Sequence, residues 1–66
     1  MLKYIAQENF SELGRFETME QAVEAIHNVI ERRGWKIYVE EADPVDDGHD
    51  IAAGPSLTIF SVNPIR

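Results

Sequence analysis

Apolar residues between Met19 and Ile30 recur at three- and four-residue intervals, the spacing that places side chains along one side of an α-helix. The residues at both ends of this segment agree with the spacing. Thr18 and Gln21 form the pattern of a capping box, and Gly34 is a typical helix stop. The pattern therefore predicts one amphipathic helix that begins after Thr18 and ends before Gly34.

Four segments around this helix have the features of β-strands. They lie at about residues 2–7, 13–17, 35–42 and 56–62. In the third segment, Trp35, Ile37 and Val39 alternate with more polar neighbours, which is the period-two pattern of a strand with one buried face. The order ββαββ predicts an α+β fold with a four-stranded, mainly antiparallel sheet and one helix packed on one face.

The 66 residues are expected to form a single domain, since one core is all that so short a chain can build. Within it, residues 43–55 are predicted to form a long acidic loop. Pro44, Gly48, Gly54 and Pro55 interrupt any regular pattern there, and aspartates keep the segment solvated. A connection of this length is usually functional or mobile.

Both faces of the predicted sheet are apolar. The side chains expected under the helix are Leu2, Tyr4, Trp35, Ile37, Val39, Leu57 and Ile59. The opposite face would then carry Ile5, Tyr38, Phe60 and Val62. Because a contiguous exposed apolar patch is typical of an interaction surface, this face is a candidate homodimer interface. In the alternative, the C-terminal tail or the long loop folds over it.

Charge is distributed unevenly along the chain. Twelve acidic and six basic residues give a net charge of -6, and no basic side chain occurs from Ile37 to Ile65. This balance repels nucleic acid phosphates and anionic lipid, and it favours a basic protein partner. The candidate acidic surface consists of Glu40, Glu41, Asp43, Asp46, Asp47 and Asp50, with Glu20, Glu24 and Glu31 as a second edge on the helix.

Catalytic and cofactor motifs are absent from the sequence. No serine lies in a nucleophile elbow and no glycine-rich phosphate loop is present, so we expect neither an enzyme nor a cofactor. Residues 43–54 match a calcium loop only in part, because Gly54 stands where the bidentate glutamate belongs. We assign no metal ligands, and weak divalent-metal binding by the aspartate-rich loop is a second alternative function.

Direct nucleic acid binding is not expected, because a sheet that reads DNA needs a basic strand face. Lys3, Arg15 and Lys36 are the only basic residues on the predicted strands. The sequence also has no cysteine and no long apolar segment. Both observations favour a cytoplasmic protein.

These features predict a non-catalytic protein-interaction module whose acidic surface engages a basic partner. Same-face residues of a strand lie about 6.6–6.8 Å apart, close to the spacing of successive phosphates, so such a surface can act as a DNA mimic. In being short, acidic and cysteine-free, the chain is similar to phage-encoded inhibitors such as anti-CRISPR and anti-restriction proteins. That similarity implies a viral inhibitor of a nucleic-acid-binding complex. The alternative is a small structural subunit, homodimeric or part of a hetero-complex, that pairs through the apolar sheet face.

Overall fold

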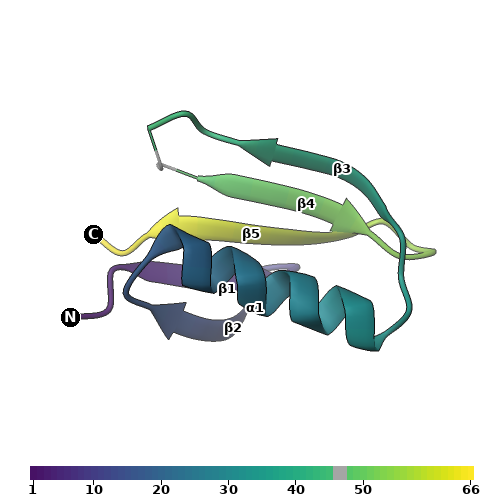
Figure 1. The fold of residues 1–66 in the computed structure, drawn as a ribbon, viewed down its shortest axis with the longest axis horizontal. Coiled ribbons are helices and arrows are strands. Elements are labelled where there is room, and N and C mark those ends of the chain that lie inside the picture. Colours follow the sequence, from purple (N-terminus) through teal and green to yellow (C-terminus); the bar gives the residue numbers. More distant parts are fainter. Residues whose placement is uncertain (46–47) are drawn as a thin grey trace.

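The computed structural model of the protein describes residues 1–45 and 48–66 and contains one helix and five strands in that part of the chain. The elements are β1 (Tyr4–Glu8), β2 (Ser11–Phe16), α1 (Met19–Arg32), β3 (Ile37–Ala42), β4 (His49–Ala53) and β5 (Thr58–Pro64). Figure 1 shows α1 lying across one face of the sheet. The α+β class is confirmed, and the predicted number of four strands was wrong.

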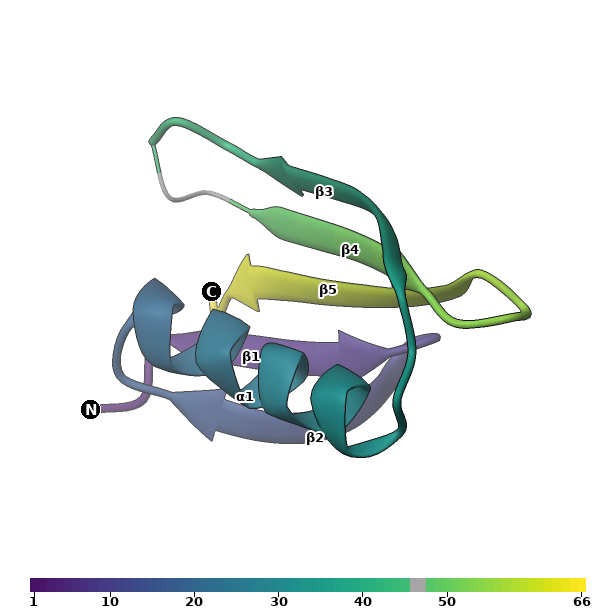
Figure 2. The same ribbon diagram turned by 45° about the vertical axis from the view of Figure 1, so that its right-hand side comes forward.

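The five strands form one antiparallel sheet in the order β2-β1-β5-β4-β3. The last strand of the chain, β5, lies in the middle of the sheet, between β1 and β4. The helix packs on β1, β2 and β5, whereas the hairpin formed by β3 and β4 extends past it (Figure 2). One half of the sheet is therefore covered on its helix side, and β3 is an edge strand exposed along most of its length.

The predicted loop at residues 43–55 contains β4, and this prediction was wrong. Ile51 and Ala53 are buried, Ala52 between them is half-buried and Asp50 is exposed, which is the alternation of a half-buried strand. The residues that indicated a loop lie outside the strand: Pro44 and Gly48 precede it, and the segment 54–55 follows it. A strand of five residues between such turn residues is too short to show a clear period.

The helix begins and ends as its sequence predicts. The Thr18 hydroxyl accepts a hydrogen bond from the Gln21 amide at 3.1 Å, and the Gln21 side-chain oxygen accepts one from the Thr18 amide at 3.3 Å. At the other end Gly34 has a φ of +68°, a conformation that glycine adopts without strain. No helix in the described part of the chain has the length and hydrophobicity needed to cross a membrane.

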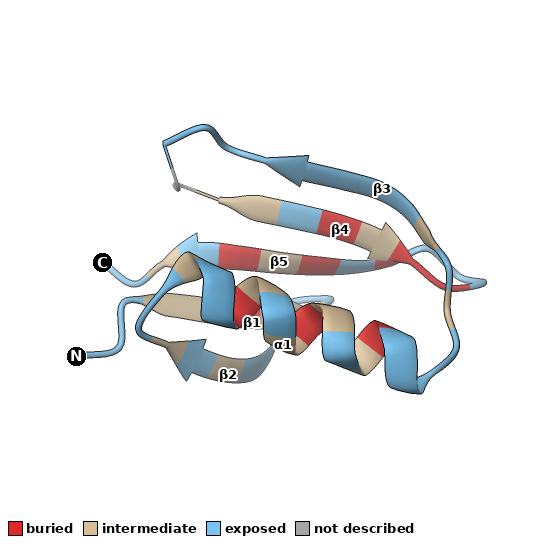
Figure 3. Ribbon diagram, viewed as in Figure 1, coloured by how far each residue is buried: buried red, intermediate tan, exposed pale blue. Residues whose placement is uncertain are grey.

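The core lies between α1 and the covered face of the sheet (Figure 3). Phe60 and Val62, which the sequence placed on the opposite face, are fully buried in this core. Leu57 was predicted to be part of the last strand, but it lies in the turn before β5 and has a φ of +51°. Because side chains alternate along a strand, an error of one residue moves every side chain to the other face.

Irregular pairing and the start of β1 explain further errors in the predicted faces. Val39 was expected under the helix and is 49% exposed, because the pairing of β3 with β4 shifts between Ile37 and Val39. Leu2 precedes β1 and is exposed, as are Leu57 and Ile59. Of the residues predicted for the outer face, Tyr38 is exposed and Ile5 is half-buried.

Candidate functional site

The structure divides the predicted acidic surface between the two faces of the sheet. Glu40 pairs with buried Ile51 and lies on the helix side, whereas Glu41 pairs with Asp50 and lies on the outer side. The helical residues Glu20, Glu24 and Glu31 are exposed. Asp46 and Asp47 are outside the described residues. The seven described residues of this set therefore lie on different faces of the molecule and do not form one continuous surface.

Glu41, Asp43 and Asp50 form a smaller group, called the outer acidic cluster below. Glu41 and Asp50 are directly opposite each other on β3 and β4, and all three residues border an open depression that Ala42 and Gly48 complete. Like charges directly opposite each other in a sheet are destabilising. Within residues 1–45 and 48–66 none of these three carboxylates forms an ion pair.

Glu40 has a different environment, which the sequence did not predict. Its Oε2 atom lies 2.9 Å from Nε2 of His27 on α1 and 2.7 Å from Nε2 of His49 on β4. An ionised carboxylate can only accept hydrogen bonds, so both Nε2 atoms carry a proton when Glu40 is charged. This His–Glu–His cluster joins the helix to the β3–β4 hairpin at a place where α1 does not cover the sheet.

The hydrogen bonds in the His–Glu–His cluster favour the charged form of Glu40. Partial burial raises the pKa of the Glu40 carboxyl, but the hydrogen bonds from His49 and His27 outweigh it, and the pKa lies below its ordinary value. Folding therefore stabilises the ionised carboxylate. The stability that results is fully present above the unfolded pKa of a glutamate, about 4.3, and is lost as the pH falls through the lowered pKa.

We expect Glu40→Gln to remove this pH-dependent part of the stability. At about pH 6 the variant should be less stable by roughly 1 kcal/mol or less, because the cluster is partly exposed. The difference should shrink as the pH falls below about 4. Urea unfolding between pH 7 and pH 3 measures it, and Glu41→Gln on the outer face is the matched control. Equal losses in the two variants would contradict a stabilising role for the cluster.

The His–Glu–His cluster does not form a metal site as it stands. No group of three or more His, Asp or Glu side chains is placed to hold a metal ion in the described part of the chain. The reason is geometric, because both imidazoles contact the same oxygen atom, which occupies the place that an ion would need. The cluster instead acts as a polar cross-link between three elements. Whether the aspartate-rich segment binds metal weakly stays a prediction, since Asp46 and Asp47 are not described.

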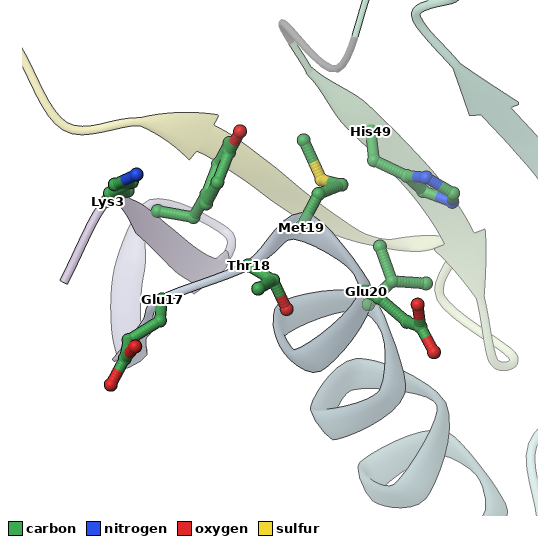
Figure 4. Close-up of a pocket in the computed structure, with 8 residues that line it drawn as sticks. Lys3, Glu17, Thr18, Met19, Glu20 and His49 are labelled. Atoms are coloured by element: carbon green, nitrogen blue, oxygen red, sulfur yellow. The ribbon is translucent and has the colours of Figure 1, made fainter. Parts of the chain in front are cut away.

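His49 also borders an open depression at the start of the helix. Figure 4 shows Met19 lying between Lys3 on one side and His49 on the other. The only hydroxyl labelled there belongs to Thr18, and it accepts a hydrogen bond from Gln21 as the helix cap. The depression is also lined by Tyr4, and its imidazole is already hydrogen bonded to Glu40.

An ion pair between Arg33 and Glu8 lies at the other end of the molecule. The Arg33 guanidinium donates two hydrogen bonds of 2.9 Å to the two carboxylate oxygens of Glu8. It also lies 4.7 Å from the centre of the Trp35 ring. The hydrogen bonds to Glu8 raise the pKa of Arg33. This arginine is thus occupied by an internal partner and does not neutralise the outer acidic cluster.

Comparisons with known protein families, with curated proteins and with solved structures give no match to this chain.

Proposed function

We propose that this protein is a non-catalytic interaction module whose outer acidic cluster binds a basic surface on a protein partner. The observation that carries the proposal is the pairing of Glu41 with Asp50 on neighbouring strands, with Asp43 bordering the same depression and no ion pair from any of the three to the described residues. Keeping two carboxylates opposite each other costs the folded protein stability. A basic partner would relieve that repulsion on binding.

The most fitting partner is a DNA- or RNA-binding protein whose nucleic acid groove the cluster occupies. Such a groove carries clustered lysine and arginine for phosphate contacts. The net charge of -6 and the absence of basic residues from Ile37 to Ile65 would direct the approach of this partner and repel nucleic acid itself. In this proposal the protein is an inhibitor that acts as a nucleic acid mimic, comparable in class to anti-CRISPR and anti-restriction proteins.

The test is a double charge reversal in the outer acidic cluster, Glu41→Lys with Asp50→Lys. We expect binding to purified nucleic-acid-binding enzymes from a bacterial panel to weaken by roughly tenfold or more, and the wild-type affinity to fall similarly between low and moderate salt. The readouts are the dissociation constant and displacement of bound DNA from the enzyme. The two lysines keep one like-charge pair across β3 and β4 in place of another and attract Asp43 instead of repelling it, so loss of folding is not expected.

The matched control is Glu24→Lys with Glu31→Lys on the helix, which changes the net charge by the same amount. Retained binding in this control together with loss in the cluster variant would support a local surface. Equal loss in both variants would show that net charge alone is responsible. Binding that does not change with salt in any variant would contradict the proposal.

A second candidate function is a structural subunit that pairs through the outer face of the sheet. Val39, Ala52 and Ile59 are paired side by side across three strands, and Val39 and Ile59 are about half exposed. The homodimer face predicted from the sequence included Phe60 and Val62, but both lie in the core. The row of Val39, Ala52 and Ile59 is therefore the candidate pairing surface. Sedimentation at high salt distinguishes the candidates, because an apolar dimer persists there and dissociates on Val39→Glu.

A further inference from the structure

The two edge strands of the sheet, β2 and β3, carry different charges (Figure 2). β3 presents Glu40 and Glu41 and no basic side chain. β2 presents one acidic residue, Glu12, and one basic residue, Arg15. An edge strand has backbone N–H and C=O groups with which a further strand can pair. Because like charges on paired strands repel each other, a second copy of this chain is disfavoured at β3 but not at β2.

Glu12 and Arg15 lie on the same face of the sheet, although they are three residues apart. Their partners on β1 are Gln7 and Ile5. These two partners flank Ala6, which is buried in the core, so Glu12 and Arg15 face away from the helix. Residues three apart in a regular strand lie on opposite faces. The bulge in β2 between the two residues removes this difference.

This arrangement makes the β2 edge complementary to itself. When two copies of β2 lie antiparallel about a two-fold axis between Leu13 and Gly14, each Glu12 lies opposite Arg15 of the other copy. The two residues of an antiparallel pair share one face of the sheet. Glu12 and Arg15 meet this condition only because of the bulge, since a regular strand would place them on opposite faces.

The ion pair within one chain leaves part of both side chains available. Arg15 donates from Nε and from Nη2 to the same atom, Oε1 of Glu12, and both distances are 3.2 Å. Within residues 1–45 and 48–66, Oε2 of Glu12 and Nη1 of Arg15 have no hydrogen-bond partner. The side chains are also 48% and 49% exposed. Each of them can therefore bind a second copy without giving up its internal partner.

We propose that the protein forms a homodimer in which two β2 strands pair edge to edge and join the two sheets into one. Backbone hydrogen bonds between the strands hold the copies together, and the two ion pairs between Glu12 and Arg15 set the register. The two acidic β3 strands then lie at the far edges of the joined sheet. A six-residue strand makes a small interface, which is typical of weak association, so we expect the dimer to form at about 0.1 mM protein.

This dimer does not rest on the proposed function, because β2 and the outer acidic cluster lie on opposite edges of the sheet (Figure 2). It also differs from the dimer of the second candidate function, which pairs through the outer face. Val39→Glu dissociates a dimer that pairs through that face, and it should leave pairing through β2 unchanged. Failure of one proposal is therefore distinguishable from failure of the others.

The test exchanges the two charges of β2, singly and together, in the full chain. Arg15→Glu and Glu12→Arg each place two like-charge pairs in the dimer, so we expect the dissociation constant from sedimentation equilibrium to rise about tenfold or more. The double exchange, Glu12→Arg with Arg15→Glu, should restore the wild-type constant. An equal mixture of the two single variants should form a heterodimer, because one copy then presents two basic residues and the other presents two acidic residues.

The matched controls are Lys36→Glu and Glu41→Arg, which make the same changes in net charge at the opposite edge and should leave the constant unchanged. Circular dichroism checks that each variant is folded. Hydrogen exchange of the β2 amides should slow as the dimer forms, while exchange in β3 stays the same. A wild-type chain that is still monomeric at about 1 mM would overturn the proposal. So would a dimer that persists in both single variants, or a double exchange that fails to restore it.

Discussion

Replacing Phe60 by alanine is expected to remove a large part of the protein's free energy of unfolding. Phe60 is fully buried, lies between Glu8 of β1 and Ile51 of β4, and has its ring centre 6.5 Å from that of Trp35. Truncating a buried phenylalanine costs about 3–5 kcal/mol. A chain of 66 residues has about 3–10 kcal/mol of stability in total. Circular dichroism during urea titration measures the loss.

Ile59→Ala is the matched control for Phe60→Ala. Ile59 is the preceding residue on the same strand, its side chain is 47% exposed, and it lies on the opposite face. We expect this variant to lose about 1 kcal/mol or less, since little apolar surface becomes exposed. If Phe60→Ala were no more destabilising than Ile59→Ala, Phe60 would lie on the outer face as the sequence alone predicted.

The helix could be predicted from the sequence because each of its determinants is local. The spacing of Ile26 and Ile30, the capping box at Thr18 and the stop at Gly34 all act within a few residues of one another. The structure confirms each of them. The strands were harder to place, and β4 was missed because its five residues between turn residues are too few to show a clear period.

The faces of the sheet show most clearly what local pattern leaves out. The turn residue Leu57 reads as part of an alternating strand with Ile59, and including it inverts β5. In β3 the irregular pairing between Ile37 and Val39 changes the face on which the later residues lie. Turn geometry and register shifts are set by neighbouring strands, so a single sequence offers no direct signal for them.

The same limit applies to the candidate site. The acidic character of β3 was evident, but its division between Glu40 on the helix side and Glu41 on the outer side follows from the register with β4. His27 and Glu40 are thirteen residues apart and lie on different elements, so no motif spacing connects them. The alternation of side chains along β3 indicates that Glu40 and Glu41 lie on opposite faces, but the register shift between Ile37 and Val39 decides which face each one takes.

Replacing Gly54 by alanine is the second substitution expected to have a large effect. A Cβ atom at this buried position would lie 2.6 Å from two atoms of the Trp35 ring, and the backbone φ is +83°. The left-handed backbone costs about 1–2 kcal/mol and the forced repacking about 1–3 kcal/mol, which gives a loss of about 2–5 kcal/mol. Trp35 is the only tryptophan, so its fluorescence reports both the displaced ring and the unfolding transition.

Gly34→Ala separates the two causes, because Gly34 has a similar φ of +68° but no atom within 4 Å of the added Cβ. We expect this control to lose only the backbone part, about 1–2 kcal/mol, and to leave the emission of the folded protein unchanged. A larger loss in Gly54→Ala would then measure the contact with Trp35. Equal losses in the two variants would mean that backbone conformation alone requires glycine at position 54, because the Trp35 ring could move aside at little cost.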